Sequence, residues 1–254
     1  MSIVGRGRIV VWEGASLWLL ASEHDMSEVQ PHAHHAIQIT FALKGDFELC
    51  AGDECLSGPI VAVDSDTRHI FRASGVAAFL FVAPESAAGI ALAAEHFRQG
   101  PLARLASPPA IEALAALQHC FHSGASGEAL RALGRNIVAE LASGAGAGRP
   151  DPRVLGMIGY AAENLEDRVT LPAAADRINL SPGRARHLFV AHTGLPFKAY
   201  VLWLRLERAV QLYAAGASLT EAAHQAGFAD SAHLSRTFRR TFGLPAAALR
   251  LAGG

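Results

Sequence analysis

The stretch "LTEAAHQAGFADSAHLSRTFRRTFGLP" (residues 219–245) joins a short alanine-rich segment to a longer one in which cationic and hydroxyl side chains surround an apolar spine. Between the segments stands Gly227, a residue type that tolerates the left-handed backbone of a tight turn. Asp230 is a good N-cap for a following helix, and Leu234 and Phe238 lie four residues apart, on one face of it. The stretch therefore predicts two helices joined by a tight turn, which is a helix-turn-helix.

An earlier stretch repeats this pattern. Five of its positions recur 48 residues later and five recur 49 residues later, and both copies end in Gly-Leu-Pro. The pairs are Leu171 with Leu219, Ala174 with Ala222, Ala175 with Ala223, Asn179 with Gly227, Leu180 with Phe228, Ala185 with Leu234, Phe189 with Phe238, Gly194 with Gly243, Leu195 with Leu244, and Pro196 with Pro245. Asn179 tolerates a left-handed turn as glycine does, and Ser181 is placed to cap the second helix. A second helix-turn-helix is therefore predicted.

The free faces of the two predicted second helices are polar. One exposes Arg184, Arg186 and His187, and the other exposes Ser231, His233, Ser235, Arg236, Arg239 and Arg240. Such donors read base edges when a helix enters the major groove, and outlying arginines bind phosphate. Between the two helix-turn-helix units, the segment 197–216 predicts a helix of about 19 residues, which is about 28 Å long at 1.5 Å per residue. This length suits two recognition helices about one DNA turn apart, so double-stranded DNA is the predicted partner.

Residues 151–250 resemble the DNA-binding domain of the AraC/XylS family of bacterial transcription regulators. The matching motif positions are Gly227, Phe228, Leu234, Arg236, Phe238, Phe242, Gly243 and Pro245. The resemblance implies base contacts from Gly183, Arg186, His187, Ser231, Ala232, Ser235 and Arg236. Gly183 and Ala232 have no side-chain hydrogen bond to offer, so direct readout there is expected to be poor. The family also implies RNA polymerase as a partner and more often activation than repression.

The first part of the chain has a different texture. Residues 8–84 read as short strands separated by Gly, Asp, Ser and Pro turns, which is typical of a sandwich or small barrel. Residues 86–146 are rich in alanine and leucine with helical spacing, and 143–152 form the best linker candidate. We therefore expect an α+β multidomain chain: a cupin-like β jelly-roll barrel over 1–85, helices over 86–146 for dimerisation or linkage, and an all-α domain with two helix-turn-helix units over 151–254.

The segment "PHAHHAIQITFALKG" (31–45) places His32, His34 and Gln38 on one face if it is a strand. His69, on a later strand, could add a third imidazole, so His32, His34 and His69 form a candidate divalent-metal site. The spacing resembles the first cupin motif, in which a Glu stands where this chain has Gln38, and Gly45 fits that motif. His35 would face the other way as an ordinary strand residue.

Loss of the carboxylate weakens the case for a metal, because three neutral imidazoles and an amide do not offset a divalent charge. His32, His34, Gln38 and His69 therefore form a candidate effector site for either an organic ligand or a metal. The main hypothesis is a transcription regulator, with no enzyme activity, controlled by that effector. The alternative is a cupin metalloenzyme (oxygenase or isomerase) with a helical accessory domain, and a third is a protein–protein adaptor.

Composition sets the remaining expectations. Half the residues are apolar and under a fifth are charged, as in folded globular proteins. Residues 151–254 carry a balance of +4 (12 Lys and Arg against 8 Asp and Glu), which leaves −5 on residues 1–150, so a polyanion would favour the C-terminal part. Three cysteines are too few for a disulfide scaffold, and no segment approaches the length of a membrane helix. We therefore expect a cytoplasmic protein.

Three further patterns leave alternatives open. "LCAGDEC" reads as a hairpin that sets Cys50 opposite Cys55, either as small half-buried residues or as a thiol pair that responds to oxidant or soft metal. His119 and His122 lie one helical turn apart, as on a plain surface helix or an interface helix. The apolar positions Leu130, Leu133, Ile137 and Leu141 favour a homodimer, or else pack on the chain's own barrel.

Overall fold

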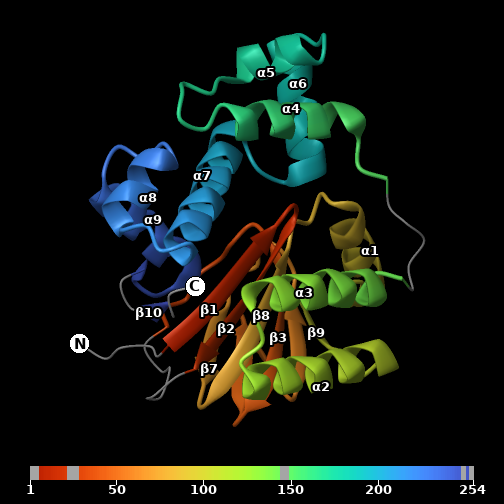
Figure 1. Ribbon diagram of the computed structural model, residues 1–254. Helices are drawn as coiled ribbons and strands as arrows, with labels where there is room; N and C mark the ends of the chain where they lie inside the picture. The colour runs from red at the N-terminus through yellow and green to blue at the C-terminus, as the bar shows by residue number, and fades with distance from the viewer. Residues whose placement is uncertain (1–5, 22–28, 144–148, 247–249, 252–254) are drawn as a thin grey trace. The chain divides into compact units, whose positions relative to one another are not determined.

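The computed structural model describes residues 6–21, 29–143, 149–246 and 250–251. Its chain forms two compact units, shown in Figure 1. The N-terminal unit combines Met1–Gly148 with Phe238–Gly254, and the C-terminal unit is Arg149–Thr237. The predicted α+β class is confirmed, because strands dominate the first part and helices follow. Five residues of the predicted linker, 144–148, lie outside the described residues.

The N-terminal unit contains two sheets. The larger has the strand order β10-β1-β2-β8-β3-β6-β9, antiparallel except where β10 pairs with β1. Its strands are β1 (Arg6–Trp12), β2 (Ala15–Ala21), β3 (Ile37–Lys44), β6 (Ile60–Val63), β8 (Val76–Val82), β9 (Leu102–Arg104) and β10 (Arg250–Leu251). The smaller sheet has the order β5-β4-β7, with β4 (Phe47–Ala51), β5 (Glu54–Ser57) and β7 (Ile70–Ala73). The strand β9 falls where the sequence predicted only helices.

Helices α1 (Ala87–His96), α2 (Pro108–Ser123) and α3 (Gly127–Leu141) belong to the same unit, and Figure 1 shows α2 and α3 lying against the large sheet. Leu130, Ile137 and Leu141 are buried in one core with the strands. The stripe on α3 therefore packs on the chain's own sheet, the second of the two alternatives, and it does not supply a dimer surface. On α2, Leu117 is fully buried, whereas Ile111 is 57% exposed.

The hairpin prediction is confirmed in register. Leu49 pairs with Leu56 and Cys50 with Cys55 across β4 and β5. The two cysteine sulfurs are joined as a disulfide, with their Cα atoms 4.1 Å apart. Cys50 is buried and Cys55 exposed, so neither is the half-buried free thiol of the simpler interpretation.

The C-terminal unit consists of α4 (Pro152–Glu163), α5 (Leu171–Arg177), α6 (Pro182–Thr193), α7 (Phe197–Ala214), α8 (Leu219–Gln225) and the start of α9 (Ser231–Phe242). The predicted repeat is confirmed in length: α5 and α8 have seven residues each, and α6 and α9 twelve each. Asn179 and Gly227 both have a left-handed backbone, with φ of 54° and 78°. Between the two helix-turn-helix copies, the 18 residues of α7 span about 27 Å at 1.5 Å per residue.

Candidate functional site

Helix α6 buries an apolar face and exposes a cationic one. Ala185 and Phe189 are fully buried, and the Phe189 ring meets the Phe197 and Tyr200 rings of α7 edge-on at 5.1 and 5.2 Å. Every candidate DNA contact on α6 is exposed: Gly183, Arg184, Arg186 and His187. This face is therefore accessible to a polyanion in the described structure.

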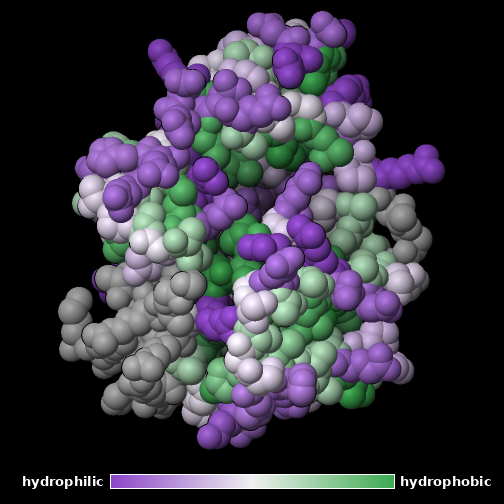
Figure 2. All heavy atoms as spheres, viewed as in Figure 1, coloured by the Kyte–Doolittle hydropathy of each residue, from purple (hydrophilic) through white to green (hydrophobic). Residues whose placement is uncertain are grey.

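Helix α9 repeats this division. Asp230 caps its start, since the backbone N–H of His233 donates to Asp230 Oδ1 at 2.5 Å. Leu234 and Phe238 are buried, as predicted. The exposed candidates are Ala232, Arg236, Arg239 and Arg240, and the half-buried ones are Ser231, His233 and Ser235. Figure 2 shows hydrophilic side chains gathered over α5 and around α8 and α9.

Two of the half-buried candidates already have partners within the chain. The Ser235 hydroxyl donates to the Ser231 carbonyl at 2.8 Å, and the His233 ring meets the Phe228 ring at 5.1 Å. Both would have to exchange these contacts to reach a base. Among the α9 residues that the family resemblance assigns to base contact, Arg236 is the one that is both exposed and equipped with a fork of side-chain donors.

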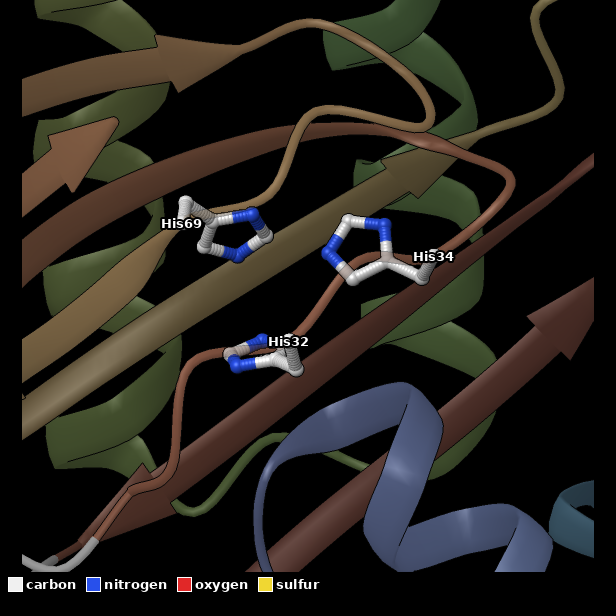
Figure 3. Close-up of side chains that lie close together, drawn as sticks. All are labelled: His32, His34 and His69. Atoms are coloured by element: carbon white, nitrogen blue, oxygen red, sulfur yellow. The ribbon is translucent and has the colours of Figure 1, made fainter. Parts of the chain in front are cut away.

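The three predicted histidines come together in the N-terminal unit, as Figure 3 shows. Backbone hydrogen bonds pair His32 with His69 in both directions, at 3.0 and 2.8 Å. The ring centroids lie 4.3 Å apart for His32 and His69, 5.0 Å for His34 and His69, and 5.8 Å for His32 and His34. All three side chains are buried. The predicted strand is shorter than expected, because β3 begins at Ile37, yet the alternate histidines still converge.

Burial favours the neutral, unprotonated form of these imidazoles. It lowers the pKa of His32 to about 4, with the nearby His69 adding to the effect. Burial likewise lowers the pKa of His69 and holds the pKa of His34 well below its ordinary value of 6.5. Gln38, the fourth predicted effector residue, is also buried. Its Oε1 lies 3.0 Å from His34 Nε2, and its Nε2 donates to Thr40 Oγ1 at 2.9 Å.

A small pocket with a cavity volume of about 40 Å³, partly open to solvent, adjoins the cluster. It is lined by Trp18, Leu20, Val29, His32, Gln38, Phe71, Phe79, Phe81, Phe242 and Leu244. Sequence reasoning found the two polar members but missed the aromatic ones. Their signal was present in the alternation of β2 and β8, where Trp18 pairs with Phe79 across the strands, but alternation does not say which face encloses a ligand.

His35 corrects a prediction. It is no ordinary strand residue: it is buried before β3 begins and bonds two carboxylates, Asp66 at 2.8 Å and Glu85 at 3.2 Å. Burial by itself would lower the pKa of His35, but these two bonds and charges raise it to about 9. A charged imidazolium fits between two acceptors, so His35 connects the loop before β7 to the turn that follows β8. His119 and His122 are both exposed, as expected of a plain surface helix.

Comparison with known proteins identifies the helical repeat. Residues 174–252 match a family profile described as "Helix-turn-helix domain". The activator RhaS of Escherichia fergusonii is 37% identical over 94 residues, which are 37% of this chain and 34% of RhaS. The bifunctional transcriptional activator and DNA repair enzyme Ada of Escherichia coli is 38% identical over 88 residues, 35% of this chain and 25% of Ada. The chain thus matches about a third or less of the length of these curated relatives.

The whole fold has a solved counterpart. The crystal structure of ToxT from Vibrio cholerae O395 aligns with 93% of this chain and 96% of its own, with a TM-score of 0.59 and 11% identity. A second ToxT structure, from strain SCE256, contains an unsaturated fatty acid and aligns with 91% of this chain and 92% of its own, with a TM-score of 0.58 and 12% identity. At these identities the likeness shows the fold alone. Within the described residues, no helix has both the length and the apolar character needed to cross a membrane.

Proposed function

From the premise that the C-terminal part of this chain is a helix-turn-helix domain of the AraC type, we propose that the whole protein is a sequence-specific DNA-binding transcription regulator controlled by a ligand in its N-terminal unit. The observation that carries the proposal is the duplicated unit. Both copies have the same helix lengths and a left-handed residue in the turn. Both also carry an exposed cationic helix face.

In this function, α6 and α9 enter successive major-groove segments of one duplex. Arg186 and Arg236 read base edges, because their forks match the acceptors of guanine. His187, Ser231, His233 and Ser235 supplement them, and Ala232 can contribute only methyl contact. Arg184, Arg239 and Arg240 bind phosphates and set the register. Gly183 lets the backbone approach closely without a side-chain contact.

The effector is proposed to bind in the pocket beside the histidines. Its aromatic lining suits a small apolar body, and Gln38 and His32 offer polar partners. The fatty acid seen in ToxT is an apolar molecule with one polar end, and the shared fold supports a similar type of ligand here. The pocket lining includes Phe242 at the end of α9, so a ligand there contacts a helix that also carries DNA-binding residues.

The remaining parts of the proposal follow from the function. A regulator of this kind acts in the cytoplasm, binds RNA polymerase when it activates, and occupies paired sites as a homodimer. The three domain segments proposed are 1–85 for the effector, 86–146 for the intervening helices and 151–254 for DNA. Regulation is favoured over cupin enzyme chemistry because the matched relatives are regulators, with Ada's match confined to a quarter of its length. In the part of the chain that the structure describes, moreover, the histidine cluster includes no carboxylate.

Selection of duplexes from a random pool, followed by gel-shift measurement, tests the proposal. We expect enrichment of a site with two contacted segments about 10 base pairs apart. Affinity should fall steeply with salt, by about 0.9 logarithmic units per tenfold salt increase for each phosphate bound. An affinity for protein partners combined with no enrichment of any duplex would instead favour the adaptor hypothesis.

Two single substitutions separate the roles. Arg236→Ala is expected to cost about 1–3 kcal/mol, or about 5- to 150-fold, on the selected site and to relax one base position. Arg240→Ala should weaken selected and random DNA alike and reduce the salt slope by about one. Arg98→Ala, which removes an exposed charge from the N-terminal unit, is the matched control. Equal losses on both DNAs for both variants would show that the assigned roles are wrong.

A further inference from the structure

The three buried histidines share one tautomer. Nδ1 of His32 lies 2.9 Å from the Gln30 carbonyl, that of His34 lies 3.1 Å from the Ala36 carbonyl, and that of His69 lies 2.9 Å from the Thr67 carbonyl. A carbonyl oxygen only accepts hydrogen bonds, so each Nδ1 must carry the proton. In a neutral ring the lone pair then belongs to Nε2 in all three residues.

These lone pairs are not all used within the chain. His69 Nε2 is buried and has no hydrogen-bond partner among the described residues. His34 Nε2 faces Gln38 Oε1 at 3.0 Å, which sets two acceptors against each other unless the amide turns over. A buried polar atom without a partner is costly, whereas a leucine or phenylalanine would fill the same space without that cost. The cluster therefore has the character of a binding site rather than of core packing.

One ring nitrogen from each histidine lies within 4.8 Å of the other two. We propose that His32, His34 and His69 bind one divalent transition-metal ion through their Nε2 atoms, with at least one coordination position open to the adjoining apolar pocket. Backbone carbonyls that hold the opposite ring nitrogen are the usual outer support of metal-bound histidine, because they fix both tautomer and ring orientation. The cluster would close slightly around an ion, since zinc–nitrogen bonds are about 2.0–2.1 Å long.

The ligand set decides which ions fit. Three imidazoles suit zinc, copper, nickel or iron, whereas magnesium and calcium prefer oxygen ligands. His32, His34 and His69 form the group without a carboxylate, and Gln38 is neutral, so a bound ion keeps its full double charge. Such an ion attracts an anion into its open position. The pocket wall beside it, including Phe81 and Trp18, would favour an anion with an apolar body.

Metal binding does not depend on the proposed regulatory function, but its effect on DNA does. His32 lies directly beside Gly243, the residue that follows α9. A Cβ built on Gly243 would stand 2.7 Å from His32 Nδ1, and the Gln30 N–H donates to the Gly243 carbonyl at 2.9 Å. In Figure 3 the C-terminal helix, in blue, passes below His32. Binding of an ion by His32 should therefore change the position of the residues at the end of α9.

The test uses the untagged full-length protein, stripped with a chelator and titrated with Zn²⁺ by calorimetry and with Co²⁺ by visible absorption. We expect one equivalent and the d–d spectrum of a nitrogen-ligated Co²⁺ site. His69→Gln and His32→Gln should each weaken binding by at least about tenfold, the loss that follows even when supporting groups are removed. The double variant His119→Ala/His122→Ala, which removes the exposed pair on α2, should bind as the unchanged protein does.

Retention of full affinity in both glutamine variants, or loss of binding in the control, would overturn the proposal and reveal an adventitious surface ion only. Circular dichroism of the stripped variants guards against misfolding, and His34→Gln provides a third ligand variant if one fails to fold. Gel shifts of the same samples separate the two proposals. DNA binding without any metal uptake would refute the metal site and leave the proposed regulatory function intact. Metal uptake without DNA binding would refute the regulatory function and leave the metal site intact.

Discussion

Gly227 forms the turn of the second helix-turn-helix, and replacing it with alanine should destabilise the C-terminal unit strongly. Its φ is 78°, where a residue with a Cβ costs about 1–2 kcal/mol. A Cβ there would also overlap the Leu165 carbonyl oxygen and stand 2.8 Å from Arg205 Nε. Arg205 Nε donates to that carbonyl at 3.1 Å, and breaking a charged hydrogen bond costs about 1.5–3 kcal/mol. Together the two effects predict a loss of about 2.5–5 kcal/mol in unfolding free energy.

Two other glycines of the same unit isolate the contributions. Gly216 has φ of 99°, further from the left-handed minimum, but its built Cβ has nothing within 4 Å. Gly216→Ala should therefore cost the backbone strain alone, about 1–2 kcal/mol. Gly159 lies inside α4 with open space around it, so Gly159→Ala should stabilise by about 0.5–1 kcal/mol.

Urea unfolding of the full-length variants, followed by circular dichroism, provides the comparison, and gel shifts of the same samples give the effect on DNA binding. We expect the order Gly159→Ala, unchanged protein, Gly216→Ala, Gly227→Ala, from most to least stable. Equal costs at Gly227 and Gly216 would show that the close approach to Leu165 is not real. The cost of Gly227→Ala would then be explained by its left-handed backbone alone.

Further expectations concern the N-terminal unit. The folded pKa of His35, about 9, exceeds its ordinary 6.5, so its contribution to stability is complete below pH 6.5 and disappears as the pH rises through 9. In chelator-treated protein, the unfolding free energy of the unchanged chain should fall toward that of His35→Gln over this range, by up to about 3 kcal/mol. If the difference in unfolding free energy between the unchanged chain and His35→Gln did not vary with pH, the ion pairs of His35 would be contradicted. Leu130→Ala should cost about 2–5 kcal/mol, since Leu130 is fully buried in the chain's own core, and sedimentation should show no change of oligomeric state. Cys55→Ser should cost at most about 2 kcal/mol, because the Cys50–Cys55 disulfide spans only five residues, and a reducing agent should abolish the difference.

The helical half was predictable because its rules are local. Caps, turns and apolar spacing operate within a few residues, so the sequence around Asn179 and Gly227 contained the information that positions α5, α6, α8 and α9. The duplication strengthened the prediction, since two copies had to satisfy the same pattern. The cysteine hairpin was predictable for the same reason, because a two-residue tip sets the register of both strands.

Long-range partners were not predictable. His35 bonds carboxylates 31 and 50 residues away, and nothing in its neighbourhood distinguishes it from an ordinary strand residue. The stripe that includes Leu130 has the spacing of a helix face, but spacing does not say whether that face meets a second copy or the same chain. The pocket had the same difficulty, because Trp18 and Phe81 become neighbours of the histidines only when the strands pair.

The two copies of the repeat have similar sequences but different surroundings. Phe189 of the first is covered by Phe197 within the C-terminal unit. Phe238 and Phe242 of the second belong to the N-terminal unit, where the Trp18 ring meets them at 6.4 and 4.9 Å. The opposite face of the same helix bears its exposed arginines. A ligand that distinguishes two positions of Phe242 must therefore also distinguish two states of a DNA-binding helix, by as much as its affinities for them differ. Because Phe242 of the second copy lines the pocket, we expect an effector to act on the second copy.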